Sequence, residues 1–195
     1  MRQPIGEITT EEEYFHQQEV ELIDKMRKRA ETEDRRHCMA EAAHIHDPKV
    51  AEAMTELGYS PTTVPLLCLV PLVQVAWADG WVRRGERKLI LSIARLHGVL
   101  ENTPIHQKLV EWLDRSPSDR FFEGSLAVIQ AISASLPESE RCARHKVLLQ
   151  DCRDVAHAAG WHLGGIGETE RSLIEKLEKL LTEHPKATPA AGASR

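Results

Sequence analysis

Histidine and acidic side chains could bind a metal ion, and the chain holds ten histidines. Glu41 and His44 are three residues apart, the spacing at which helices of di-iron carboxylate proteins present ligands. Such sites use two Glu-x-x-His pairs and two further glutamates on facing helices, and this constellation is not evident in the sequence. Asp154 and His157 share the spacing, with His162 soon after, but a single set of this kind is common by chance. The histidines alone therefore do not indicate a metal enzyme.

Nucleophilic and phosphate-binding motifs are not indicated either. The glycine-rich stretch at residues 160–167 lacks the preceding strand and the lysine of a phosphate-binding loop. No serine or cysteine lies in a nucleophile elbow, which is built between a strand and a helix. The four cysteines form no Cys-x-x-Cys pair and predict reduced thiols of a cytoplasmic protein: Cys38, Cys68, Cys142 and Cys152. We expect a protein that is not an enzyme.

Composition excludes several other classes of protein. The formal net charge is −5 over 195 residues, so we expect no general attraction to nucleic acid. The first residues hold no apolar stretch of a signal peptide. The longest apolar run, residues 64–78, is interrupted by Pro65, Pro71 and Gln74, and it is shorter than the roughly 20 residues that span a bilayer. No transmembrane segment is predicted.

Apolar residues recur three and four positions apart along nearly the whole chain, which predicts an all-α fold. We divide the chain into a flexible N-terminus (1–9), a long charged amphipathic helix (10–46), a helical domain (47–184) with a short lead-in helix (47–58), and a disordered tail (185–195). Asp47 and Pro48 resemble a cap followed by proline at the first helical position. Ser116 and Pro117 predict the start of another helix in the same way. A core helix kinked by its two prolines is expected from Ser60 to about residue 80.

Two segments, residues 75–90 and 155–174, are similar to each other. Each is a helix end, then Gly-Trp, a loop, and Glu-Arg opening an amphipathic helix. Trp81 and Trp161 hold equivalent places, where they could cover the junction or form an exposed aromatic patch. The pattern predicts an internal helix–turn–helix repeat.

The first copy, A-x-A-D-G-x-V-x-x-x-E-R-x-x-I, resembles the signature of the TerB-like family. That family includes a tellurite-resistance protein and the N-terminal domain of a membrane-anchored DnaJ-type co-chaperone. The resemblance covers about residues 64–181. It implies a helical bundle of about seven helices with pseudo-twofold character, preceded here by the long N-terminal helix.

The same resemblance implies that acids at the loops contact a divalent cation or a partner. Asp79 and Glu86 match in the first copy, and Glu170 in the second, where Ala159 replaces an aspartate. The alternative is a structural role for each residue. Asp79 would be a turn residue before Gly80, and Glu86 would be an acid in the first turn of a helix, where it interacts favourably with the helix dipole. No other cofactor is expected.

Residues 11–29 are similar to the inhibitory helix of the mitochondrial ATP synthase inhibitor protein, through acids before a Tyr-Phe pair and a later basic cluster. In that family the helix inserts into the ATPase head. The segment also carries a narrow apolar stripe that should bury against a partner, a second copy or its own domain. The residues predicted to bind are Tyr14, Phe15, Leu22, Ile23 and Met26.

Three functions follow as expectations. The first is a non-enzymatic TerB-like interaction domain, with a role in stress response and an N-terminal docking helix. The second is a regulator that inserts residues 11–29 into an ATPase or another enzyme. The third is a protein that binds a divalent metal.

Overall fold

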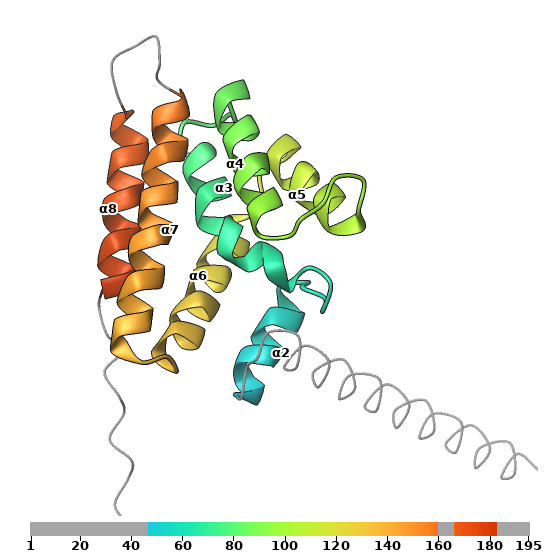
Figure 1. Cartoon of the computed structure of the whole chain (residues 1–195), viewed down its shortest axis with the longest axis vertical. Coiled ribbons are helices and arrows are strands. Elements are labelled where there is room, and N and C mark those ends of the chain that lie inside the picture. Colours follow the sequence, from blue (N-terminus) through green and yellow to red (C-terminus); the bar gives the residue numbers. More distant parts are fainter. Residues whose placement is uncertain (1–46, 160–165, 183–195) are drawn as a thin grey trace, which may run out of the picture.

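The computed structural model describes residues 47–159 and 166–182, and these residues form helices and no strand (Figure 1). The predicted all-α class is confirmed. Seven α helices and one 3-10 helix follow in chain order: α2 (Pro48–Glu56), η1 (Val64–Leu69), α3 (Val70–Ala76), α4 (Arg84–Leu96), α5 (Pro104–Asp114), α6 (Asp119–Ala134), α7 (Glu138–Ala159) and α8 (Glu168–Thr182). The predicted N-terminal helix (10–46) and tail (185–195) lie outside the described residues.

Short polar residues begin several helices. Asp47 caps α2 by accepting a hydrogen bond from the Lys49 N–H at 2.9 Å, and Pro48 takes the first helical position, as predicted. Thr103 caps α5 in the same way. The cap of α6 is Ser118, whose Oγ accepts from the Phe121 N–H at 3.2 Å. The predicted cap at Ser116 is wrong by two residues, because residues 116–118 are not helical and α6 begins at Asp119.

The predicted kinked core helix is two helices. Residues 61–63 form a turn, η1 follows with Pro65 in its first turn, and α3 begins one residue before Pro71. Proline is tolerated in the first turn of a helix because the N–H that it lacks has no partner there. Each proline therefore starts a new helix where the sequence predicted a bend in one. Six of the seven residues of α3 are buried, and this confirms the segment as the centre of the core.

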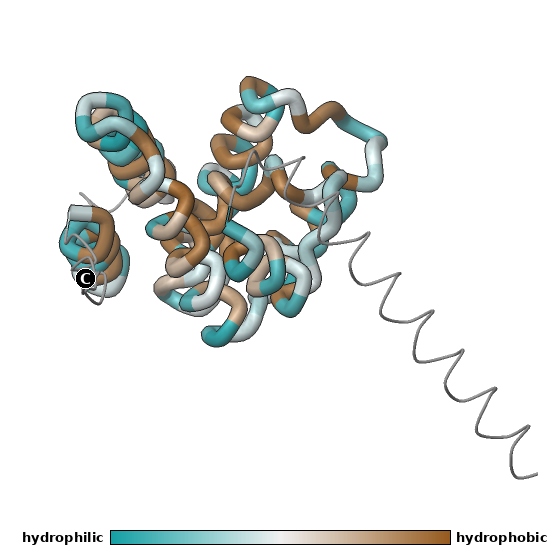
Figure 2. The backbone as a smooth tube through the Cα atoms, turned by 90° about the horizontal axis from the view of Figure 1, so that it is seen from below, coloured by the Kyte–Doolittle hydropathy of each residue, from teal (hydrophilic) through white to brown (hydrophobic). Residues whose placement is uncertain are grey.

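The other helices surround α3. It contacts α4, α6, α7 and α8, while α2 packs on α6. In Figure 1, α7 and α8 run antiparallel as a pair beside α3, and α6 lies below α3 and beside the lower half of α7. Figure 2 shows apolar residues gathered where the helices face one another. An aromatic group on the α2 side adds to this core: Tyr59, Trp112, Phe121 and Phe122.

No helix among the described residues is long and apolar enough to cross a membrane. Within the same residues Cys68, Cys142 and Cys152 are free thiols, as predicted, and Cys38 lies outside them.

Gly85 brings the start of α4 against the end of α7. A Cβ atom at this position would lie 2.4 Å from the backbone oxygen of Ala158, well inside van der Waals contact. Backbone atoms in the last turn of a packed helix cannot move aside as a side chain can. The close approach of α4 to α7 therefore requires glycine here.

Gly85→Ala should lower the free energy of unfolding by about 2 kcal/mol, because the added methyl group overlaps the Ala158 carbonyl. Gly124→Ala is the matched control. There the nearest atoms are the mobile Cδ atoms of Leu57, at 2.6 and 3.0 Å, so the cost should stay below about 1 kcal/mol. Urea denaturation with equal m-values measures both. Equal stability of the two variants would contradict the close approach.

Candidate functional site

The two glutamates of the predicted repeat play the same local role. Glu86 is the third residue of α4, and its Oε2 accepts a hydrogen bond from the Arg83 N–H at 2.6 Å. Glu170 is the third residue of α8, and its Oε2 accepts from the Gly167 N–H at 2.8 Å. Each carboxylate thus satisfies an N–H group just before its helix. Both side chains are buried, which is unusual for a capping glutamate.

Burial changes the acidity of Glu86. Loss of solvation raises its pKa to about 7, and the negative charges of Glu170 and Asp79 act in the same direction. The hydrogen bond from Arg83 opposes this shift, but it engages only Oε2. The other oxygen, Oε1, has no hydrogen-bond partner among the described residues. Glu86 and Glu170 therefore form a buried carboxyl pair, and Glu86 exchanges its proton near neutral pH.

Asp79 has a different hydrogen-bond partner from Glu86 and Glu170. Its Oδ2 accepts a hydrogen bond from the Arg83 guanidinium at 2.7 Å, in a partly exposed ion pair. Gly80, the next residue, takes φ 95°, a left-handed turn that favours glycine. Asp79 thus holds the turn before α4, the structural alternative raised from the sequence.

Of the predicted metal-binding set, Glu86 and Glu170 are thus buried capping residues, and Asp79 is paired with arginine. Two carboxyl groups offer four oxygen atoms, and Ca²⁺ takes six to eight. Among residues 47–159 and 166–182, no cluster of three or more His, Cys, Asp or Glu side chains is placed to hold a metal ion. Metal binding by Asp79, Glu86 and Glu170 stays a prediction.

The predicted partner-binding residues, Tyr14, Phe15, Leu22, Ile23 and Met26, lie outside the described residues, and their role also stays a prediction. Trp161 lies outside them too.

Trp81 does not cover the helix junction. Its side chain is 64% exposed, and an aromatic binding patch at this position stays a prediction. A large apolar side chain left in water on a loop is available for contact with another molecule.

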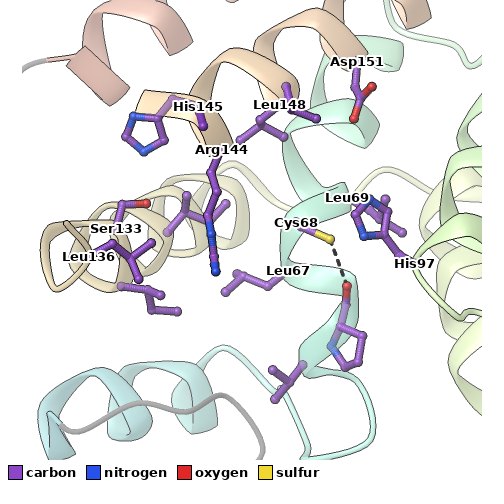
Figure 3. Close-up of a pocket in the computed structure, with 16 residues that line it drawn as sticks. Leu67, Cys68, Leu69, His97, Ser133, Leu136, Arg144, His145, Leu148 and Asp151 are labelled. Carbon is purple, nitrogen blue, oxygen red and sulfur yellow. Dashed lines mark hydrogen bonds between the residues drawn. The ribbon is translucent and has the colours of Figure 1, made fainter. Parts of the chain in front are cut away.

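A pocket that the sequence analysis missed opens beside η1. It has a volume of about 580 Å³ and lies between η1, the second half of α6 and the first half of α7, with His97 at one edge (Figure 3). Most of its lining is aliphatic: Val64, Leu67, Ile129, Ile132, Leu136 and Leu148. Val147, also in the lining, is 60% exposed. Pockets of about 300–1,000 Å³ with apolar walls and few polar groups are typical of ligand sites.

Polar groups stand at three places in the pocket. Cys68, His97 and Asp151 lie on one side, Ser133 and His145 lie on the opposite side, and Arg144 extends into the space between α6 and η1 (Figure 3). The Cys68 thiol donates to the Pro65 carbonyl oxygen at 3.2 Å, and burial raises its pKa to about 11. A thiol with this pKa is protonated at neutral pH and is a poor nucleophile. Burial raises the pKa of Asp151, and the nearby charge of His97 opposes that shift.

Only one feature of the sequence points to this pocket. Its walls come from three segments separated by tens of residues, and no local pattern joins them. On α7, however, Val147 and Leu148 are adjacent, so they cannot both face the core of the bundle. An apolar residue on the outer side of a charged helix is thus the feature of the sequence that indicates the pocket.

No family model, curated protein or solved structure compared with the chain matches it. The TerB-like resemblance thus stays a prediction from the residues that carry it.

Stability should depend on the protonation of Glu86. Its pKa is about 7 in the folded chain and near 4.5 when unfolded, so the folded state holds the extra proton between these values. The free energy of unfolding should then fall as pH rises from about 4.5 through 7. Glu86→Gln removes the charge, keeps an acceptor for Arg83, and should stabilise the chain at pH 8 by on the order of 2 kcal/mol.

Thermal melting from pH 4.5 to 8 measures this effect. The variant and the unmodified chain should melt alike at pH 4.5 and separate above pH 6. Glu123→Gln, at an exposed position of α6, is the control and should show no separation. A Glu86→Gln variant less stable than the unmodified chain at pH 8 would show that the carboxylate is favoured in its charged form.

Proposed function

We propose that this chain is a non-enzymatic helical binding domain, and that the pocket between η1, α6 and α7 binds the apolar part of a ligand or partner. The observation that carries the proposal is an open pocket of about 580 Å³ whose walls are mainly aliphatic. A folded protein gains stability by burying such side chains, so an apolar hollow left open on its surface commonly serves binding.

The energetic gain from filling the pocket supports this proposal. Val147 is 60% exposed, and Val64, Ile129, Ile132 and Leu148 are only partly buried. Covering an apolar side chain contributes up to about 1.5–3 kcal/mol when burial is complete. Several partial burials of this size can offset the loss of translational and rotational freedom on association.

The groups around the pocket favour binding over catalysis. Cys68, the one thiol in the lining, has a pKa of about 11, and its S–H group donates a hydrogen bond to a backbone carbonyl. Its thiolate is therefore scarce at neutral pH, whereas nucleophilic cysteines have lowered pKa values. The geometry supports a role in which the pocket holds a molecule without reacting with it.

The sequence resemblances extend this proposal. The TerB-like signature around Asp79 and Glu86 favours a part in stress response, and the cysteine pattern favours the cytoplasm. The apolar stripe with Phe15, Leu22 and Met26 would give a second contact surface for a protein partner.

A large side chain placed in the pocket should block binding. Ala143 and Cys142 are neighbouring exposed residues of α7, and only Ala143 lines the pocket. Ala143→Trp should weaken the binding of decan-1-ol at least about tenfold, because the indole occupies the space of the alkyl chain. Isothermal titration calorimetry measures the dissociation constants.

Cys142→Trp is the matched control and should bind decan-1-ol as the unmodified chain does. The proposal fails if the unmodified chain binds no decan-1-ol, or if both variants bind it unchanged.

A second candidate function is divalent-cation binding at the carboxyl pair. The observation in its favour is the buried Oε1 of Glu86, which has no described hydrogen-bond partner and lies near Glu170. Water molecules would have to complete the coordination of a hard cation such as Mg²⁺, which commonly keeps several. The Cys and His ligands that Zn²⁺ prefers are not gathered at this pair.

For a cation site, millimolar Mn²⁺ or Ca²⁺ should raise the melting temperature of the unmodified chain at pH 7. Glu86→Gln should abolish that increase. A melting temperature that does not respond to either cation would leave the carboxyl pair as a structural feature only.

A further inference from the structure

The pocket lining holds no Phe, Tyr or Trp side chain. Its apolar lining is built from Val, Leu, Ile, Ala and Pro residues together with Cys68. The aromatic side chains of the core gather elsewhere, around Tyr59 and Trp112. A planar aromatic ligand would therefore find only the imidazole rings of His97 and His145 beside it. A flexible alkyl chain, which adapts to branched aliphatic walls by rotation about its own bonds, matches this lining better.

Arg144 brings a positive charge to the pocket. Its side chain leaves α7 and extends between Leu136 of α6 and Leu67 of η1 (Figure 3). The guanidinium carries a fixed charge and donates two parallel hydrogen bonds to a carboxylate in its preferred geometry. On the other side of the pocket, burial raises the pKa of Asp151, and the nearby His97 opposes that shift. Burial lowers the pKa of His145, which also lines the pocket, so Arg144 is the lining residue with a fixed positive charge that an anionic head group would meet.

The present partner of Arg144 can be exchanged at little cost. Arg144 donates to Glu140 at 2.7 Å, one turn earlier on α7, and both side chains are well exposed. Exposed pairs at this helical spacing contribute little to stability. A carboxylate anchored by its alkyl chain in the pocket reaches the guanidinium with a high effective concentration, so it can displace the Glu140 side chain.

We infer that the pocket binds an amphipathic carboxylate, a fatty acid of medium chain length, with its alkyl chain along Leu67 and Leu148 and its carboxylate on Arg144. The inference rests on the proposed function, since it names the ligand class of that same pocket. The inference predicts an order of affinity among ligands whose alkyl chains have the same length. Decanoate binds more tightly than decan-1-ol, and decylammonium binds most weakly.

Isothermal titration calorimetry of the full chain with these three ligands tests the ranking, below the micellar concentrations of the two ionic ligands and the solubility limit of decan-1-ol. Arg144→Gln should weaken decanoate binding about tenfold and leave decan-1-ol binding unchanged, because the lost interaction is charge-assisted. Glu140→Gln should strengthen decanoate binding severalfold by freeing the guanidinium. Arg153→Gln is the control, since Arg153 lies on the same helix but pairs with Glu178 of α8 at 3.2 Å. It should change neither affinity.

Equal affinities of the unmodified chain for decanoate and decan-1-ol would overturn the carboxylate assignment, as would an unchanged ratio in Arg144→Gln. In either case, decan-1-ol binding that is lost in Ala143→Trp would still support the proposed function. Circular dichroism of each variant confirms that the helices are intact, which is expected because Arg144 and Glu140 are exposed.

Discussion

The burial of one short apolar segment sets the positions of the other helices. α3 has only seven residues, and an isolated helix of that length is unstable in water. It persists because α4, α6, α7 and α8 surround it and exclude water from nearly all of its side chains. The preceding η1 belongs to the same apolar run, but Pro71 separates the two helices. Coverage is complete around α3 and incomplete beside η1, and the pocket opens at this junction.

The contact between α4 and α7 adds a second constraint, with an electrostatic cost. Gly85 allows the start of α4 to approach Ala158, and the next residue, Glu86, is thereby buried near Glu170. Loss of solvation is the main cause of the raised pKa of Glu86, and the nearby charge of Glu170 adds to it. Each carboxyl recovers part of the cost by capping its own helix. The caps and the pocket lie in different parts of the fold, so the two candidate functions can be tested independently.

Sequence patterns predicted the helices well, because each helix carries its own signals. Asp47 and Pro48, for example, mark the start of α2. The split at Pro71 was missed because proline is compatible both with a kink and with a new helix. The burial of Glu86 was also missed, since its helix position predicts only a first-turn acid, and burial depends on α7. The pocket could not be predicted, because Leu67, Ile132 and Leu148 meet only in the folded chain.

The central claim is that the pocket beside η1 binds a ligand. The most direct test is to follow the methyl resonances of the chain by NMR during a titration with decanoate. The methyl groups of Leu67, Ile132 and Leu148, which line the pocket, should shift. Those of Leu109 and Ile174, which are buried elsewhere in the core, should stay in place. Shifts confined to other regions, or no shifts at ligand concentrations below the micellar limit, would contradict the assignment of this pocket as the binding site.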